Sequence, residues 1–243
     1  MKASGPVFER PHHQGIAKVL GALDGTLLCG NACLFAGGTA IALRYGEFRE
    51  SVDIDFLVSY VSGYRHLRQL LTGTAGINAI VREGAILTTT REIRADQYGI
   101  RTMLEVDGHE VKFEIVLEAR IELAPPGPAD VVCGVATLTP LDMAVSKLLA
   151  NSDRWADDGV FSRDLIDLAV MAPPLGLFRA AIAKAERAYG AAVHTDLAKA
   201  IDQLKNRLGR LERCMQAMDI RMPKALMWQK IRALEQRVAR SGL

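Results

Sequence analysis

The chain has 243 residues, of which 49% are hydrophobic and 24% charged, as in an ordinary globular protein with room for one large domain or two small ones. A formal net charge of +2 excludes a strongly acidic or basic protein, and no run reaches the ~18 apolar residues that a membrane-spanning helix needs. The first residues lack the apolar middle of a signal peptide, and the four cysteines form no disulfide or zinc-site pattern, so we expect a cytoplasmic protein with no membrane partner.

The charge is unevenly distributed along the chain. Residues 196–243 carry 11 Lys/Arg and 5 Asp/Glu, a balance of +6, and the preceding residues carry 19 and 23, a balance of −4. An acidic front part and a basic tail suit a metal site combined with an anionic partner, although a solvated helix face explains the tail equally well.

Residues Gly15–Cys29 form the first predicted element, a helix, because apolar residues recur there at helical spacing. Residues Leu34–Val58 then predict a strand, a turn at Gly37-Gly38, a helix and a second strand. Side chains alternate along a strand, so one face of the second strand should carry Val52, Ile54, Phe56 and Val58, and the other Asp53, Asp55 and Leu57. Two carboxylates are thus expected side by side, which is electrostatically costly unless a divalent cation binds them.

A helix ending near Gly73 follows, and strands are expected at Ile77–Leu87 and Ile100–Leu117. The last of these contains Asp107-Gly108 between alternating runs, which predicts a hairpin with a two-residue type I′ turn. In the register set by that turn, Val106 faces His109, Leu104 faces Val111, Thr102 faces Phe113 and Ile100 faces Ile115. Arg101 then lies opposite Glu114, a carboxylate within a sheet.

Helical patterns dominate after the proline-rich segment 125–128. Thr139-Pro140 begins a helix that contains Lys147, and residues 162–168 begin another, which Pro173-Pro174 ends. Apolar residues three and four apart, from Leu197 to Met218 and again from Met227 to Val238, predict the packing seams of a helical bundle. We therefore expect an N-terminal helix with an α/β core in residues 1–130 and an α-helical domain in residues 131–243.

The predicted core offers the parts that phosphoryl-type transfer needs, namely acidic oxygens for a divalent metal and main-chain amides for phosphates. Gly37-Gly38 lets the backbone approach a triphosphate, and Thr39 opens a helix whose N-terminus favours anions. Asp53 and Asp55 supply two carboxylates. Glu114 supplies a third, either to help hold the metal or to deprotonate the attacking hydroxyl.

These residues resemble the signature of the nucleotidyltransferase superfamily, hG[GS] followed by Dh[DE]h, which belongs to the polymerase-β-like fold. More narrowly, AGGTAIALRYGEFRESVDIDF resembles the AbiEii/AbiGii toxin family, where GGTALAL…R.S.DIDF is typical, and Arg49 and Ser51 match the residues before DIDF. That family also carries a helix with a characteristic lysine and a later Arg-Asp-x-x-Asp-Leu helix. Lys147 and residues 163–168 match these two features, so the resemblance spans about residues 34–168.

The resemblance implies an α+β fold, with a polymerase-β-like nucleotidyltransferase core (a mixed sheet with flanking helices) followed by an α-helical bundle. It implies transfer of a nucleoside monophosphate from an NTP to a hydroxyl with Mg²⁺ or Mn²⁺, by the toxin of a bacterial type IV toxin–antitoxin or abortive-infection system. The acceptor would be tRNA or a protein, and a winged-helix antitoxin would be encoded nearby.

The resemblance also assigns roles to residues of this chain. The metal ligands would be Asp53, Asp55 and Glu114. The nucleotide-binding residues would be Gly37, Gly38, Thr39, Arg49, Ser51 and Lys147. The catalytic set would be Asp53, Asp55, Glu114, Lys147, Asp164 and Asp167.

Each assignment has a simpler alternative. Asp53 and Asp55 could face solvent, Glu114 could merely pair with Arg101, and Lys147 could be an exposed helix residue. Asp164 could cap its helix, leaving Asp167 to orient Lys147 or contact the nucleotide. Two other functions share this fold: an antibiotic-modifying nucleotidyltransferase and a catalytically inactive interaction module.

Overall fold

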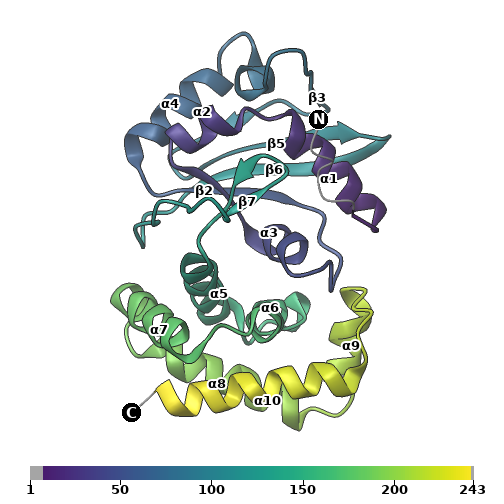
Figure 1. Cartoon of the computed structure of the whole chain (residues 1–243), viewed down its shortest axis with the longest axis vertical. Coiled ribbons are helices and arrows are strands. Elements are labelled where there is room, and N and C mark those ends of the chain that lie inside the picture. Colours follow the sequence, from purple (N-terminus) through teal and green to yellow (C-terminus); the bar gives the residue numbers. More distant parts are fainter. Residues whose placement is uncertain (1–7, 242–243) are drawn as a thin grey trace. The chain divides into compact units, whose positions relative to one another are not determined.

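The computed structural model describes residues 8–241, and the chain divides into two compact units. The first unit contains the described residues up to Glu47 and Ser51–Thr139, and the second contains Phe48–Glu50 and the described residues from Pro140 onward. Figure 1 shows a sheet with flanking helices in the purple-to-teal part of the chain and helices alone in the green-to-yellow part. The predicted fold class, a mixed sheet with helices followed by a helical region, is confirmed.

The sheet of the first unit is mixed. Its strand order is β1 (Cys33–Ala36), β2 (Ile54–Val58), β6 (His109–Leu117), β5 (Gly99–Val106) and β3 (Thr88–Thr89), and β4 (Arg94–Ala95) also pairs with β5. Strands β2 and β6 are parallel, and the other pairs are antiparallel. Phe35, Phe56 and Phe113 are buried on three neighbouring strands, with ring centroids 5.6 Å apart, so the core lies against one face of this sheet.

The hairpin of β5 and β6 has the predicted register. All four predicted pairs occur, and Arg101 lies opposite Glu114. Asp107 and Gly108 have φ angles of 50° and 80°, as the two central residues of a type I′ turn require.

The helices of the first unit are α1 (Pro11–Ala22), α2 (Gly25–Gly30), α3 (Gly37–Arg44) and α4 (Val61–Leu71). The prediction of one helix over Gly15–Cys29 is wrong, because the chain breaks at Leu23 and restarts with Asp24, whose carboxylate accepts a hydrogen bond from the Leu27 amide at 2.9 Å. At the break the Asp24 amide donates to the Ile80 oxygen and the Arg82 amide donates to the Ala22 oxygen, each at 2.9 Å, so the main chain there bonds to another segment. The first residue of α2 is also closely packed: a Cβ on Gly25 would lie 2.2 Å from the main-chain oxygen of Gly134. Gly134 lies in the turn between β7 (Val131–Val132) and β8 (Val135–Ala136), a small hairpin of the first unit.

The prediction of a strand at Ile77–Leu87 is also wrong. Residues Gly76–Ile80 form the 3₁₀ turn η1, and Ile77 and Ile80 are both buried. A spacing of three residues places two side chains on one side of a 3₁₀ turn, whereas a strand requires an even spacing.

The second unit is helical. Its elements are α5 (Pro140–Arg154), the 3₁₀ turn η2 (Asp158–Val160), α6 (Arg163–Met171), α7 (Leu175–Tyr189), α8 (Ala192–Asn206), α9 (Arg210–Ala217) and α10 (Lys224–Ser241). The predicted seam of α10 is confirmed, since Met227, Ile231, Leu234 and Val238 are buried. The predicted seam before it is interrupted: α8 ends at Asn206, Gly209 has a φ of +71°, and Leu208 between them is fully exposed.

Within residues 8–241, no helix combines the length and the apolar character that crossing a membrane requires.

Candidate active site

Strand β2 and the residue before it place the two predicted carboxylates on one face. Ile54, Phe56 and Val58 are buried on the opposite face, whereas Asp53 and Asp55 are half-buried. Val52 departs from the predicted alternation: it precedes the strand and is 44% exposed. The pairing of β2 with β1 and β6 puts Asp55 opposite Ala36 and directly beside Glu114.

The first glycine of the Gly37-Gly38 turn lies against Asp55. Gly37 has a φ of +71°, and a Cβ added there would lie 2.5 Å from Oδ2 and 3.0 Å from Cβ of Asp55. Only glycine combines this backbone conformation with so close an approach. The turn and the carboxylate strand, recognised in the sequence as two separate motifs, are therefore in contact.

Glu114 is held by two cations. Arg101 Nε donates to Glu114 Oε1 and Lys112 Nζ donates to Oε2, each at 2.5 Å. Burial acts to raise the pKa of Glu114, but the hydrogen bonds and charges of Lys112 and Arg101 outweigh it and hold the pKa below its usual value. The predicted alternative for Glu114, an ion pair with Arg101, is thus present, and Lys112 adds a second one.

Lys112 also experiences the carboxylates of β2. Burial acts to lower its pKa, but the bond to Glu114 and the charges of Glu114, Asp55 and Asp53 raise it. The ammonium group therefore supplies positive charge to the carboxylate cluster in which a divalent ion is predicted.

Within the described part of the chain, no group of three or more His, Cys, Asp and Glu side chains is arranged to hold a metal ion. Asp53 and Asp55 nevertheless provide hard oxygen donors on one face, the ligand type that Mg²⁺ and Mn²⁺ prefer. Glu114 fits as a third ligand if a metal replaces Lys112 at Oε2.

Thr39 and Ser51 position the start of the carboxylate strand. Thr39 is buried, its hydroxyl donates to the main-chain oxygen of Asp53 at 2.5 Å, and it lies 2.8 Å from the Ser51 hydroxyl. Both side chains are predicted to contact the nucleotide; here Thr39 bonds to the residue before β2, and the Ser51 hydroxyl lies against the Thr39 hydroxyl.

His13 joins this arrangement, although no pattern in the sequence signals it. The ring is fully buried in α1, with Nδ1 2.8 Å from Glu47 Oε1 and Nε2 accepting from the Ser51 amide at 3.2 Å. An acceptor at Nε2 requires the proton on Nδ1, so the ring donates to the carboxylate of Glu47. His13 therefore connects the two residues that flank Phe48–Glu50.

The second unit contains a buried ion network. Lys147 Nζ lies 2.9 Å from Asp164 Oδ1 and 2.7 Å from Asp167 Oδ2. Arg154 donates to both oxygens of Asp164 at 2.7 and 3.0 Å, and Arg49 donates to both oxygens of Asp167 at 2.7 and 2.9 Å. The alternative in which Lys147 is an exposed helix residue is therefore wrong, because this side chain is only 5% exposed.

The network explains the charge states of its members. Burial acts to raise the pKa of Asp164, but Lys147 and Arg154 hold it far below the usual value. Burial acts to lower the pKa of Arg49, and the bidentate contact with Asp167 raises it. The alternative role for Asp164 is a helix cap. Asp164 does lie in the first turn of α6, but its carboxylate bonds to the side chains of Lys147 and Arg154. Asp167 contacts the Lys147 ammonium group, as orienting Lys147, one of its two predicted roles, requires.

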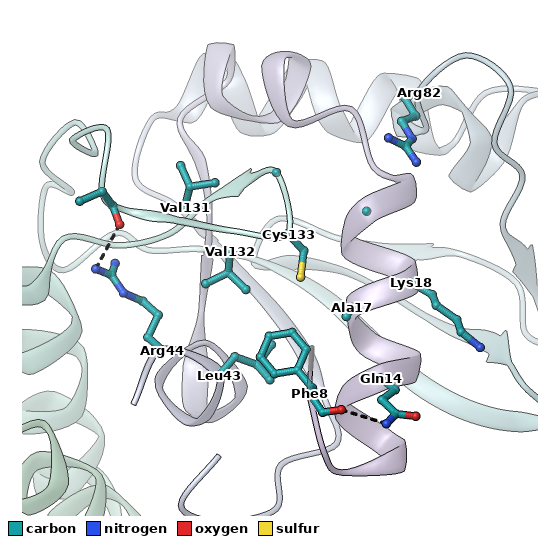
Figure 2. A pocket seen from close by; sticks show the side chains of 13 residues that line it. Phe8, Gln14, Ala17, Lys18, Leu43, Arg44, Arg82, Val131, Val132 and Cys133 are labelled. Carbon is teal, nitrogen blue, oxygen red and sulfur yellow. Dashed lines mark hydrogen bonds between the residues drawn. The ribbon is translucent and has the colours of Figure 1, made fainter. Parts of the chain in front are cut away.

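A pocket of about 980 Å³ also lies in the first unit, between α1, the end of α3 and the β7–β8 hairpin (Figure 2). Phe8, Leu43 and Val132 line it together with Cys133, whose thiol pKa is raised by burial. The lining within the described residues includes none of the predicted site residues, so pocket size alone does not mark the reaction site.

Comparisons with known proteins agree with the fold and the motifs. The family model described as nucleotidyl transferase AbiEii toxin, type IV TA system, matches residues 22–238. JHP933 from Helicobacter pylori is similar in structure with a TM-score of 0.53 at 17% identity, over 97% of this chain and 93% of that chain. A "putative nucleotidyltransferase from H. pylori" gives a TM-score of 0.48 at 17% identity, over 94% of this chain and 92% of that chain. No curated protein matches.

The structural likeness supports the fold, and the family model covers most of the chain. The predicted family and the nucleotidyltransferase class are both confirmed. The chain belongs to the AbiEii family of nucleotidyltransferase toxins of type IV toxin–antitoxin systems.

Proposed function

We propose that this protein transfers a nucleoside monophosphate from an NTP to a hydroxyl of tRNA or of a protein, with Mg²⁺ or Mn²⁺, in the bacterial cytoplasm. The observation that carries the proposal is the approach of the Gly37 main chain to Asp55, which leaves 2.5 Å between a would-be Cβ and Oδ2. A metal–triphosphate substrate needs main-chain amides that can approach its phosphates and, next to them, carboxylates that can hold its metal.

Asp53 and Asp55 would hold the divalent ion, with Glu114 as a third ligand. The metal, when bound, supplies positive charge to the phosphate oxygens and to the attacking hydroxyl. A carboxylate whose pKa is lowered is a weak base, so Glu114 fits a ligand or electrostatic partner better than a general base.

In the reaction, the acceptor oxygen would bond to the α-phosphorus while the bond from that phosphorus to the bridging oxygen of the β-phosphate breaks. Pyrophosphate leaves, and the acceptor proton passes to solvent. The main-chain amides of the Gly37-Gly38 turn and the N-terminus of α3 would bind the triphosphate.

We propose that Lys147 stabilises charge on the triphosphate, with Asp164 and Asp167 holding its ammonium group. The ion pairs of the network join three cations, Arg49, Lys147 and Arg154, to two carboxylates, Asp164 and Asp167. The charge of Asp153 also acts on Arg154. The positive charge of Lys147 would favour an anionic ligand. Arg49, predicted as a nucleotide contact, would act by holding Asp167.

The test is incubation with each α-³²P-labelled NTP, Mg²⁺ and total bacterial tRNA. We expect label on tRNA with the unchanged protein and none with Asp55→Asn, which keeps the size of the side chain. Asp107→Asn, an exposed aspartate of the same unit at the β5–β6 turn, should leave labelling unchanged. Label on a protein would assign the other acceptor, and equal labelling by Asp55→Asn would refute the proposed metal site.

The family implies an antitoxin partner. We propose that it is a winged-helix regulator encoded beside this gene, and co-expression should restore growth that the toxin alone inhibits.

A further inference from the structure

The two carboxylates of the candidate metal site are fixed in different ways. Asp55 lies within β2, where it pairs with Ala36 on one side and Glu114 on the other. Asp53 precedes β2, whose first paired residue is Ile54. The sheet therefore holds the main chain at Asp55, whereas the position of Asp53 depends on the segment that leads into the strand.

Side chains from two helices hold that segment. Thr39 of α3 donates its hydroxyl to the main-chain oxygen of Asp53 at 2.5 Å. His13 of α1 accepts a hydrogen bond at Nε2 from the Ser51 amide at 3.2 Å. The hydroxyls of Thr39 and Ser51 lie 2.8 Å apart, which joins the two contacts. Residues 51–53 are therefore held at both ends by side chains.

Glu47 determines which nitrogen of the His13 ring carries the proton. Its carboxylate accepts from the amides of Glu9 and Arg10 at 2.8 and 3.2 Å and lies 2.8 Å from His13 Nδ1. Burial acts to raise the pKa of Glu47, but these hydrogen bonds hold it below its usual value, so the group is an anionic acceptor. Nδ1 therefore donates to Glu47, and Nε2 is left as the acceptor that the Ser51 amide needs.

Helix α1 gives the ring a rigid base. Ile16 and Leu20 of this helix are fully buried. A Cβ on Gly15 would lie 3.1 Å from Cγ1 of Val106 at the end of β5, so the helix packs closely on the sheet. The hydrogen bond to Ser51 therefore ties the segment before β2 to a fixed part of the first unit.

We infer that His13 is a positioning residue for nucleotidyl transfer: through the Ser51 amide it fixes the main chain of residues 51–53 and thereby directs the Asp53 carboxylate toward the metal. The inference rests on the proposed function, because His13 has this role only if Asp53 holds a metal ion. The ring is fully buried, so it acts through Ser51 and does not touch the substrate. Its loss should displace Asp53 and leave Asp55, which the sheet holds, in place.

The test separates the two hydrogen bonds of the ring. In His13→Asn the side-chain amide group can take the place of Nδ1 and donate to Glu47, but it is too short to reach Ser51. In His13→Gln the side-chain oxygen can take the place of Nε2 and accept from Ser51. The control is His66→Asn, which changes an exposed histidine whose Nδ1 lies 2.9 Å from Asn31 Oδ1.

Each protein is assayed for Mn²⁺ affinity, for the kcat of nucleotidyl transfer and for stability in urea. His13→Asn should bind Mn²⁺ about tenfold more weakly and lower kcat about tenfold, as the loss of a group that orients a metal ligand does. His13→Gln and His66→Asn should keep both quantities close to those of the unchanged protein. Since each His13 variant loses one buried hydrogen bond, their stabilities should be similar.

Two results of this comparison would overturn the inference. One is an equal loss of kcat in His13→Asn and His13→Gln, which would show that the bond to Ser51 is not what matters. The other is an unchanged Mn²⁺ affinity in His13→Asn, which would show that Asp53 does not depend on the ring.

A second measurement does not depend on the stability of His13→Asn. With ¹⁵N-labelled histidine, the imidazole spectrum of the unchanged protein should show His13 as the Nδ1–H tautomer at neutral pH, the less common tautomer of free histidine. The signal is assigned by its absence in His13→Gln. An Nε2–H or doubly protonated ring would overturn the inference, because neither form can accept from the Ser51 amide.

The proposed function and this inference fail in distinguishable ways. Transfer by Asp55→Asn would refute the metal site, and His13 would then have no catalytic carboxylate to position. If Asp55→Asn is inactive and His13→Asn keeps both its kcat and its Mn²⁺ affinity, the metal site stands and only the role of His13 is refuted.

Discussion

The main chain of Gly37 and the carboxylate of Asp55 are so close that a Cβ on the glycine would lie 2.5 Å from Oδ2. This contact connects the first residue of α3 to the strand β2, which follows α3 in the chain. Because the Cβ of Asp55 would also be only 3.0 Å away, the carboxylate cannot yield by rotation alone. The orientation of Asp55 therefore depends on a residue that bears no side chain.

Gly37→Ala should displace Asp55 and lower nucleotidyl transfer at least tenfold. It should also destabilise the first unit by about 1–2 kcal/mol, because an alanine is strained at a positive φ. Gly46→Ala is the matched control: Gly46 has a φ of +80°, and no atom lies within 4 Å of a Cβ there. Both variants should lose stability in urea denaturation through the strain at a positive φ, and Gly37→Ala should lose more because of its clash with Asp55. Only Gly37→Ala should lose activity; equal activities would contradict the contact.

Lys112→Met should strengthen Mn²⁺ binding. Lys112 supplies positive charge to Glu114 and to the neighbouring aspartates, so a metal has to compete with its ammonium group. In a Mn²⁺ titration, with the free ion quantified by electron paramagnetic resonance, Lys112→Met should bind Mn²⁺ several times more tightly than the unchanged protein. Lys18→Met removes an exposed lysine paired with Asp107 and should leave the affinity unchanged. Weaker Mn²⁺ binding in Lys112→Met would show that this lysine supports the site.

The ion network should respond to the charge that is removed. Asp167→Asn leaves three cations with Asp164 alone, and a buried uncompensated charge costs about 3–5 kcal/mol. Lys147→Met leaves two cations with two anions, so we expect a loss of about 1–2 kcal/mol. Urea denaturation of both variants would check the order. If Lys147→Met were the less stable protein, charge balance would not govern this cluster.

The stability of the second unit should fall in acid. The folded pKa of Asp164 lies far below its unfolded value, because Lys147 and Arg154 favour the carboxylate. The contribution of Asp164 to the free energy of unfolding is therefore complete above the unfolded pKa of ~3.9. It decreases as the pH falls from that value toward the folded pKa. Asp164→Asn should be less stable than the unchanged protein at pH 7, and it should lose less stability than the unchanged protein between pH 4 and pH 2. Parallel stability curves for the two proteins would disprove the linkage.

The sequence predicted those features that local chemistry determines. Asp107-Gly108 fixes both the turn and the register of β5 and β6, and therefore the position of Arg101 opposite Glu114. The alternation in β2 fixes which face carries Asp53 and Asp55.

Features that depend on distant partners could not be predicted. Arg49 meets Asp167 across 118 residues, and His13 meets Glu47 across 34, so no spacing in the sequence signals either pair. The break before Gly25 likewise involves distant partners, since the main chain of Ala22 and Asp24 bonds to that of Arg82 and Ile80.

The assignment of Phe48–Glu50 to the second unit has a consequence for how this protein can be divided. A fragment ending at Thr139 would keep Arg49 and lose its carboxylate partner. A fragment starting at Pro140 would bury Asp167 without its bidentate cation. Exchange of either half between relatives would separate the same pair, so recombination at this border would have to preserve both residues at once. The two units are compact in space, but they are not interchangeable modules of the gene.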